Sequence, residues 1–578
     1  MNGVNYECTE PLDLVLTLIL FAQMQASKKT PQRQELIFGL VGAVGTDLTN
    51  VEMFLSRELQ NLGYVVSPIR LIYLLKIFKR WENIPTAPAD DYINQSMDAG
   101  NQFRDHTKSP DALAAMAVAK IREIRRIKTD NEEHVLPNTA FILRSLKNPA
   151  EVETLRTIYG ESFILIAAYS SHAARLRHLT KRITQSRSSF SEEEYRHVAE
   201  QLIERDQEEP GNKLGQNVRD TFHRADVFVD ATNKSNLEQS IIRFVRLLFG
   251  DTFKTPTRDE YCMFLAKAAA LRSAEMGRQV GAVISTAEGE TLSIGTNEVP
   301  KAQGGFYWEG DDPDLRDFQI GRDSNDEHKI SLLGDILKRL SGSGLLREEL
   351  SQAEINKMVE DAVAGKSSPL IRGAQLMNLI EFGRAVHAEM AAITNAAKLG
   401  VAVKGTTMHV TTFPCHMCAR HIVSCGIRRV VYIEPYSKSL ARQLYPDSIE
   451  VDDESSAGGK VKCEPFVGVG PRRYMQWFAM LADRKNRSGT AKLFKKKHAW
   501  PRCLSFPASY ILEEKETLAK LRKRLQDSGL AVVSDNHDEI SISANSRQSR
   551  RRIKANPATL TKSRKRRKSK RSNQSAKK

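Results

Sequence analysis

The sequence lacks the features of a membrane-spanning or secreted protein. Its first apolar run, Leu14 to Ala22, is too short to cross a bilayer, and the acidic residues Glu7, Glu10 and Asp13 precede it where a signal peptide would carry basic ones. The seven cysteines are odd in number and scattered, so they do not form the disulfide framework of a small secreted domain. We therefore expect a chain without a membrane segment in the reducing cytoplasm.

Acidic residues are missing from the last part of the chain. Residues 547–578 hold fifteen Lys and Arg residues and no Asp or Glu, which leaves only one unit of the net charge of +16 for everything before them. After about residue 535 large apolar residues are also scarce, so we expect a disordered tail. The basic cluster from Lys565 to Arg571 fits either phosphate contacts with a regulatory RNA or a solvated extension.

A single core cannot hold 578 residues, and the first half of the chain alternates short apolar runs with charged, helix-like stretches. This alternation predicts an α/β fold with a parallel sheet. The expected strands are in the glycine-broken apolar run that follows Glu35 and near residues 64–66, 140–146, 163–167 and 226–230. The expected domains are a P-loop-like domain at 30–250, a second α/β domain at 253–485 with a polar insert at 300–380, an extension at 486–540 and the basic tail at 541–578.

The strongest chemical pattern lies in the second domain. His387 and Glu389 are followed, after twenty-four residues, by Pro414, Cys415 and Cys418, which is the H-x-E…P-C-x-x-C pattern of zinc nucleobase deaminases. One imidazole and two thiolates hold Zn²⁺ and leave its fourth position open to water. A helix opened by the proline places the two thiolates on one face near its positive end. The pattern predicts His387, Cys415 and Cys418 as zinc ligands and Glu389 as the catalytic proton shuttle.

Each half of this pattern also has a simpler interpretation. A lone C-x-x-C fits a redox pair, and a lone His and Glu fit the polar face of a helix. Both halves at this spacing, with an apolar strand at Thr406 to Thr412 leading into the proline, favour the zinc site. No role is expected for the remaining polar residues nearby, His416, His421 and Cys425.

The segments around the motif resemble the dCMP deaminase branch of the cytidine deaminase superfamily. The resemblance rests on residues 261–271, 278–284 and 294–297 and on the two metal motifs, and it covers about 255–300 and 380–450. It implies a three-layer α/β/α fold around a mixed sheet. It also implies substrate contacts from Asn297, near the sugar, and from the backbone at Ala388, near the base.

A glycine-rich segment in the first domain is similar to a phosphate-binding loop. Gly39, Gly42 and Gly45 follow a predicted strand and precede a helix from about Val51 to Leu62. Thr46 stands where such loops carry a lysine. The next residue is an aspartate, which would repel phosphate and does not favour phosphoryl transfer.

Two further segments, 143–152 and 216–222, resemble patterns of nucleoside monophosphate kinases and dephospho-CoA kinase, with Arg144 where an acid is expected. The first domain therefore looks like a degenerate kinase fold. Three interpretations stay open: nucleotide binding without chemistry through Gly39, Gly42, Gly45 and Thr46, a purely structural domain, and an active kinase.

A degenerate P-loop module joined to a dCMP-type deaminase resembles the bacterial anti-phage dCTP deaminases. This resemblance implies conversion of dCTP and dCMP to dUTP and dUMP with release of ammonia, and depletion of the cytosine deoxynucleotide pool during infection. In some systems of this kind a small RNA holds the enzyme inactive. We also expect a homo-oligomer.

The alternative is a nucleic-acid-editing deaminase that captures RNA or DNA with its basic tail. Strand binding needs charge and aromatic stacking beside the pocket, and the nearly neutral chain before the tail does not favour it. A nucleotide sensor with a vestigial deaminase is a third possibility, but all four residues of the motif are intact.

Overall fold

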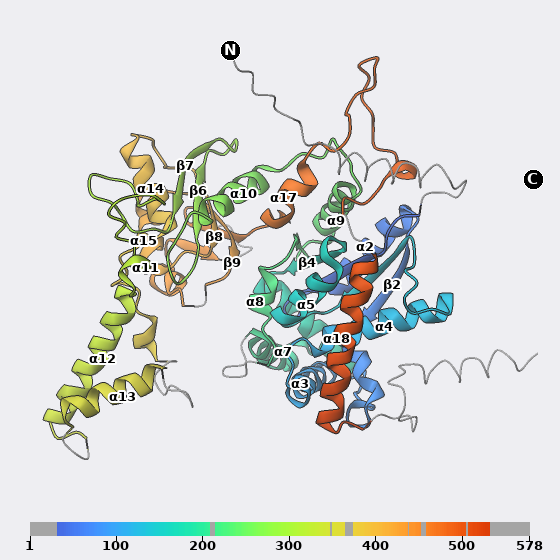
Figure 1. The fold of residues 1–578 in the computed structure, drawn as a ribbon, viewed down its shortest axis with the longest axis horizontal. Coiled ribbons are helices and arrows are strands. Elements are labelled where there is room, and N and C mark those ends of the chain that lie inside the picture. The colour runs from blue at the N-terminus through green and yellow to red at the C-terminus, as the bar shows by residue number, and fades with distance from the viewer. Residues whose placement is uncertain are drawn as a thin grey trace, which may run out of the picture.

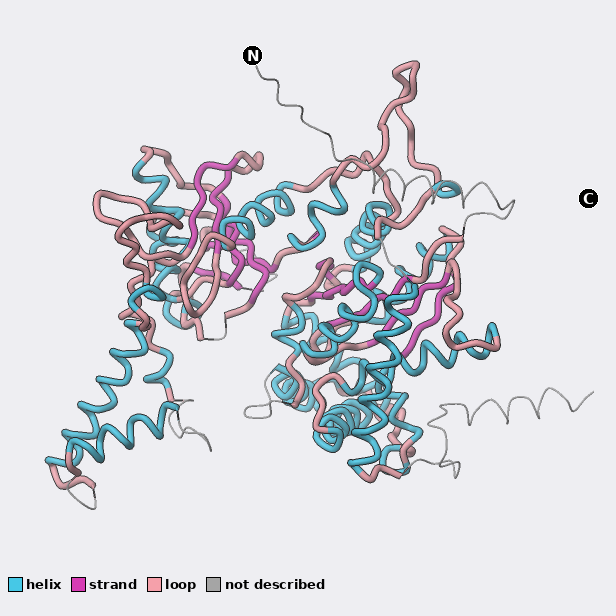
Figure 2. The backbone as a smooth tube through the Cα atoms, viewed as in Figure 1, coloured by secondary structure: helices cyan, strands magenta, loops and turns pink. Residues whose placement is uncertain are grey.

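The computed structural model describes residues 32–207, 214–346, 350–364, 374–436, 438–451, 458–503 and 507–531. The predicted basic tail and the first apolar run lie outside these residues. In the described part of the chain, no helix has both the length and the hydropathy that crossing a bilayer requires. Figure 1 shows two α/β bodies, each built around one sheet, and Figure 2 shows the strands of both sheets enclosed by helices.

The first body contains a six-stranded sheet in the order β12-β5-β4-β1-β3-β2. Five of its strands run parallel, as predicted, and only the short β12 is antiparallel, against β5. The central strand β1 is buried along its whole length. The strands are β1 (Leu36–Val41), β2 (Val65–Arg70), β3 (Thr139–Arg144), β4 (Phe163–Tyr169), β5 (Val227–Asp230) and β12 (Gly468–Val469).

Helices cover both faces of this sheet because alternate β1 side chains point to opposite sides. Leu36, Phe38 and Leu40 pack with the apolar sides of α2 and α9, whereas Ile37 and Val41 belong to the core formed with α4 and α5. The helices are α2 (Leu48–Asn61), α3 (Ala89–Thr107), α4 (Ala112–Thr129), α5 (Pro149–Tyr159), α6 (His172–Ser186), α7 (Glu192–Gln207), α8 (Val218–Phe222) and α9 (Lys234–Leu248). Short 3-10 turns are η1 (Leu71–Ile77), η2 (Lys79–Trp81) and η3 (Gly160–Ser162).

The second body contains a mixed six-stranded sheet in the order β10-β11-β9-β8-β6-β7. Strand β6 pairs antiparallel with β7 and β8, and the pairs from β8 to β10 are parallel. Helix α10 (Arg258–Ala270) packs on one face, and α14 (Ala388–Lys398) and α15 (His416–Ser424) pack on the other. The strands are β6 (Gly281–Ser285), β7 (Thr291–Thr296), β8 (Thr407–Thr412), β9 (Arg429–Glu434), β10 (Ile449–Val451) and β11 (Val461–Pro465), and α16 (Ala441–Leu444) precedes β10.

The polar insert contributes helices rather than strands. Helices α11 (Asp317–Ile320), α12 (Ser324–Gly342) and α13 (Gln352–Ala364) are followed by the 3-10 turn η4 (Gln375–Asn378). Helices α12 and α13 share a small apolar core that includes Leu333, Ile355 and Val359, and together they project away from the sheet at the lower left of Figure 1. The base of this hairpin stays next to the second sheet.

After β11 the chain returns to the first body. Strand β12 extends the first sheet, α17 (Pro471–Phe478) packs near α9, and α18 (Pro507–Ser528) packs against α3, α4 and α5, with the 3-10 turn η5 (Lys496–His498) between them. The domain boundaries drawn from the sequence placed these residues in the second domain and in a separate extension. In space they complete the first body, because apolar residues of both segments, among them Trp477 and Tyr510, enter its core.

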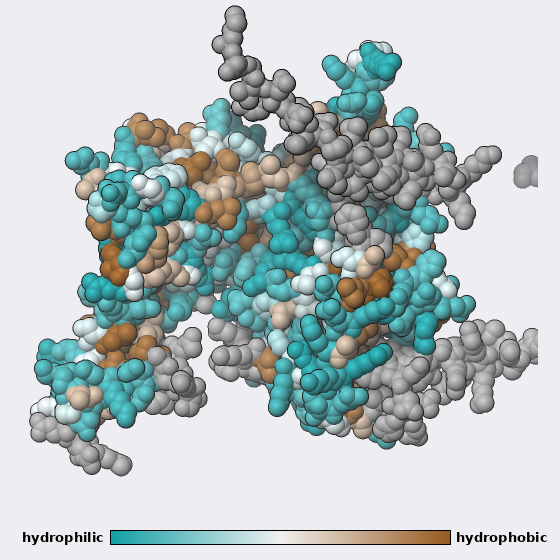
Figure 3. Space-filling model, viewed as in Figure 1, coloured by the Kyte–Doolittle hydropathy of each residue, from teal (hydrophilic) through white to brown (hydrophobic). Residues whose placement is uncertain are grey.

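The visible surfaces of the two bodies differ. Hydrophilic side chains cover most of the first body in Figure 3, whereas apolar patches are more frequent over the second. Large apolar residues with more than a third of their surface exposed there include Ile294 on β7 and Leu399 after α14. The expected homo-oligomer stays a prediction.

Candidate metal and active site

The first part of the site lies at the start of helix α14. His387 is the N-cap, in an extended conformation, and Glu389 is in the first turn. A glycine on the neighbouring strand lets this helix approach closely: a Cβ atom on Gly295 would lie 2.1 Å from the Ala388 carbonyl oxygen. The strand therefore fixes the depth at which His387 and Glu389 enter the site.

The second part lies at the start of helix α15. Cys415 is its N-cap rather than its first helical residue, and its sulfur accepts a hydrogen bond from the Cys418 backbone N–H at 3.4 Å. The sequence predicted both cysteines on one helical face. In the structure Cys415 caps the N-terminal end of α15 and Cys418 lies in its first turn. Both sulfur atoms therefore lie at the N-terminal end of this helix.

These two helix starts bring three metal-ligand atoms together. Nδ1 of His387 lies 3.3 Å from the Cys415 sulfur and 3.4 Å from the Cys418 sulfur. All three ligand atoms lie within 4.8 Å of one another. An imidazole nitrogen and two thiolates at such spacing fit Zn²⁺, which prefers tetrahedral nitrogen and sulfur coordination and would have one position left for water.

The same groups change one another's protonation. Hydrogen bonds with Cys418 and His387 lower the pKa of the Cys415 thiol to about 4, which favours the thiolate that a metal needs. The contact with Cys415 raises the pKa of His387 to about 9. Burial raises the pKa of Glu389 to about 7.

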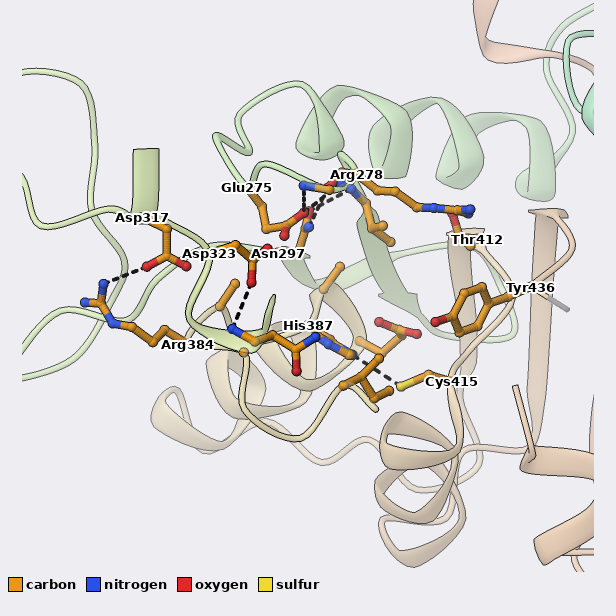
Figure 4. Close-up of a pocket in the computed structure, with 18 of the residues that line it drawn as sticks. Glu275, Arg278, Asn297, Asp317, Asp323, Arg384, His387, Thr412, Cys415 and Tyr436 are labelled. Atoms are coloured by element: carbon orange, nitrogen blue, oxygen red, sulfur yellow. Dashed lines mark hydrogen bonds and ion pairs between the residues drawn. The ribbon is translucent and has the colours of Figure 1, made fainter. Parts of the chain in front are cut away.

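A pocket of about 340 Å³ opens beside these groups. His387, Glu389 and Cys415 line its floor, and Figure 4 shows His387 pointing toward Cys415 with Tyr436 and Thr412 nearby. The opposite wall comes from the insert, which the sequence left without a role. It contributes Asp317, Asp323, Asn325, Asp326 and Lys329 to the lining.

Cations gather at the insert side of this pocket. Lys329 is nearly buried and pairs with Asp326 at 2.6 Å, and Arg384 pairs with Asp317 at 2.6 Å. Arg278 lines the pocket as well and pairs with Glu434 at 2.5 Å. A phosphate would compete with these carboxylates for the cations of the pocket.

The predicted substrate residues Asn297 and Ala388 both line the pocket. Asn297 also ties down the adjacent loop: its Nδ2 donates to the Arg278 carbonyl at 2.6 Å, and its Oδ1 accepts from the Val280 N–H at 2.7 Å. Its side-chain amide is thus engaged with the backbone of residues 278–280. Contacts of either residue with sugar or base stay predictions.

Sequence reasoning missed the charged lining residues Glu275, Arg278, Lys329 and Arg384. Arg278 is the first residue of segment 278–284, on which the family resemblance rests, so its position near the site could have been predicted. Lys329 and Arg384 gave no such signal, because only the three-dimensional path of the insert brings them to the motif.

The predicted phosphate-binding loop has the expected strand-loop-helix form, but its glycines serve packing. Gly39 lies inside β1, where a Cβ atom would be 2.6 Å from the Leu146 side chain. Gly45 has a φ of +88°, and a Cβ atom there would lie 2.7 Å from the Arg175 carbonyl oxygen. Gly42, Gly45 and Thr46 line a second pocket, and nucleotide binding through them stays a prediction.

Comparisons with known proteins concern the second body. Residues 256–434 match the model of the cytidine and deoxycytidylate deaminase zinc-binding region. Deoxycytidylate deaminase of Enterobacteria phage T4 is 46% identical over 54 residues, which is 9% of this chain and 28% of that protein. ComE operon protein 2 of Bacillus subtilis (strain 168) is 36% identical over 77 residues, 12% of this chain and 41% of that protein.

These relatives are matched over less than half of their own length. The human deoxycytidylate deaminase is 45% identical over 47 residues, 8% of this chain and 25% of that protein. A crystal structure of dCMP deaminase from the cyanophage S-TIM5 aligns with 36% of this chain and 98% of that chain, at 16% identity and a TM-score of 0.19. From the matched model and the cluster of His387, Cys415 and Cys418, we conclude that residues 256–434 carry a zinc-binding region of the cytidine and deoxycytidylate deaminase type, with Zn²⁺ as its cofactor.

Proposed function

We propose that this protein hydrolyses the amino group of cytosine in free deoxynucleotides, converting dCMP and dCTP to dUMP and dUTP with release of ammonia. One observation carries the proposal. A buried carboxyl, Glu389, lines the same pocket as two members of a His, Cys, Cys zinc site, within a zinc-binding region of the deaminase type.

Each residue has a distinct part in the proposed reaction. His387, Cys415 and Cys418 hold Zn²⁺, which supplies acidification of the attacking water. Glu389 accepts a proton from that water, delivers it to N3 of the base, and then assists departure of ammonia. The backbone at Ala388 contacts the base, and Asn297 holds the loop at residues 278–280 beside the sugar.

The charges around the pocket favour a single nucleotide over a nucleic-acid strand. Arg278 and Lys329 can bind one phosphate group if it replaces part of their contacts with Glu434 and Asp326. Glu275, Asp323 and Asp326 also line the wall and would repel a continuous phosphate backbone. A compact phosphorylated substrate satisfies both features. We further propose that the cellular role is defence against phage by depletion of dCTP, which rests on the resemblance of the two-module sequence.

The test is to incubate the purified, zinc-loaded chain with dCMP, dCTP, CTP and a cytosine-containing single strand, and to separate the products by chromatography. We expect dUMP or dUTP from the free deoxynucleotides. In the Glu389→Gln variant the rate should fall by about 10²-fold or more while zinc content is unchanged, because only the proton transfer is lost.

Removal of residues 547–578 is the control for the editing alternative. Deamination of free nucleotides should continue at a similar rate without these basic residues. Product formed only on the strand, and lost with the deletion, would replace the proposal by nucleic-acid editing.

A further inference from the structure

A second pocket lies in the first body, at the ends of β1, β2 and β3 and between helices α3 and α6. Five cationic residues that line it come from different parts of the chain: Arg70, Arg104, Arg144, Lys147 and Arg182. Of these, Arg104 is buried and pairs with the buried Glu151 at 2.8 Å, so its charge is already neutralised. No Asp or Glu belongs to its lining as the structure describes it. The deaminase pocket differs in this respect, since five carboxylates line it.

Three arginines of this pocket, Arg70, Arg144 and Arg182, are poorly neutralised. Within the described residues, neither Arg70 nor Arg182 has a carboxylate at ion-pair distance, and Arg144 has only Glu52, at 3.3 Å. All three arginines line the same pocket, and burial, Arg70 and, to a smaller extent, Arg182 lower the pKa of Arg144. A pocket with such an excess of positive charge is stabilised by an anion.

The adjacent glycine-rich loop has its own anions already. The Val44 N–H donates to a carboxylate oxygen of Asp206 at 2.6 Å, and Lys147 pairs with the other oxygen of Asp206 at 2.9 Å. Asp47 accepts from the Thr49 and Asn50 N–H groups at the start of α2. These carboxylates take the Val44 N–H of the loop and two N–H groups at the start of α2, which a kinase loop would offer to phosphate. Arg70, Arg144 and Arg182 remain as charged donors for a ligand.

The rest of the lining is suited to an organic group. Leu71, Tyr92 and Met97 supply apolar and aromatic surface. Four polar atoms of lining residues are buried without a hydrogen-bond partner among the residues that the structure describes: Thr46 Oγ1, Ser96 Oγ, Arg104 Nε and Gln216 Oε1. Buried polar atoms of this kind are normally satisfied, so a ligand with hydrogen-bonding edges fits here.

We propose that this pocket binds a nucleoside phosphate, with Arg70, Arg144 and Arg182 on the phosphate and the apolar wall against the nucleoside. The site is separate from the zinc region and independent of the proposed deamination. It also differs from the site expected from the sequence, because the arginines rather than the glycine loop hold the phosphate.

The test is calorimetric titration of the full chain with AMP, a purine nucleotide chosen so that a cytosine pocket does not contribute. The double variant Arg70→Glu, Arg182→Glu should bind AMP at least tenfold more weakly. Both side chains are exposed, so folding should be unaffected, as unchanged zinc content and melting temperature would verify. Lys181→Glu is the matched control, because Lys181 is an exposed cation next to Arg182 on α6 but does not line the pocket. This variant should bind AMP as tightly as the unmodified chain.

Inorganic phosphate and pyrophosphate are titrated in parallel. Tighter binding of AMP than of phosphate supports a nucleoside-binding wall, and equal binding overturns that part of the proposal in favour of a simple anion site. Absence of AMP binding to the unmodified chain, or equal AMP binding by the double variant, overturns the proposal altogether. Hydrogen-exchange protection by AMP should appear in residues 65–75 and 139–147, and protection confined to residues 383–389 would place AMP in the deaminase pocket instead.

Discussion

At the level of single residues, the spacing of His387, Glu389, Cys415 and Cys418 was sufficient to predict a zinc site. Ligand type and spacing are local properties, and the two helix starts that carry them are signalled by the sequence itself. The backbone conformations at these helix ends could not be predicted from the sequence. Nothing in the sequence distinguishes Cys415 as an N-cap from Cys415 as a helical residue, because the difference lies in its extended backbone conformation.

Substitution of one zinc ligand tests this assignment directly. In Cys415→Ser or Cys418→Ser, bound zinc per chain should fall on the order of tenfold or more, because serine does not supply a thiolate. Metal analysis after gel filtration measures the loss. Cys425→Ser is the control, since Cys425 lies just beyond α15, outside the three-residue cluster, and should keep its zinc. Equal zinc in all three variants would contradict the site.

At the level of elements, the insert is where sequence reasoning stopped. From the sequence it was a polar insert at 300–380, and in the structure it forms α12 and α13. Their position on the wall of the deaminase pocket was not predictable, because it follows from the way residues 298–325 and 380–387 run beside each other. Helices α12 and α13 bury their apolar residues mainly against each other, so their sequence does not indicate which part of the protein they lie beside.

The insert should therefore affect substrate binding. Lys329→Ala removes a nearly buried cation from the pocket wall, and we expect the KM for dCMP to rise about tenfold with kcat little changed, because a charged contact to phosphate is lost. Steady-state kinetics on dCMP measures both parameters. Lys338→Ala, an exposed lysine farther along the same helix, should behave like the unmodified chain. An unchanged KM in Lys329→Ala would exclude the insert from substrate binding.

At the level of the whole molecule, alternating apolar runs and helix-like stretches predicted the parallel sheet of the first body. All five predicted strands are present. Four of them, β1, β3, β4 and β5, are buried and nearly continuous apolar runs, as parallel strands in a covered sheet are, whereas the edge strand β2 is mostly exposed. The return of the chain after β11 was not foreseen. Strand β12 has only two residues, and α18 joins the first body through buried ion pairs with partners almost 400 residues away, which no local pattern reveals.

These ion pairs should dominate the docking of α18. Glu514 is fully buried. Its carboxylate accepts hydrogen bonds from Arg125 at 2.8 Å, Arg122 at 3.2 Å and the Tyr159 hydroxyl at 2.9 Å. In Glu514→Ala, Arg125 keeps Glu35 and Arg122 keeps Glu132, but each loses one acceptor and the buried Tyr159 hydroxyl loses its acceptor. The free energy of unfolding should therefore fall by about 2–3 kcal/mol. Denaturant titration measures the change. Glu516→Ala, two residues on and exposed, should be nearly neutral, and equal effects of both variants would refute the role of the buried network.

The place of β12 and α18 has a consequence for biosynthesis. The second body is made entirely between two stretches of the first, and the chain leaves and re-enters close to one point, where Glu260 of α10 accepts a hydrogen bond from the Val469 N–H at 2.7 Å. On the ribosome, the zinc-binding body is complete before Trp477, Tyr510 and Glu514 have been synthesised. The body that begins the chain is therefore the last to close, in reverse of the usual order in which amino-terminal domains fold first.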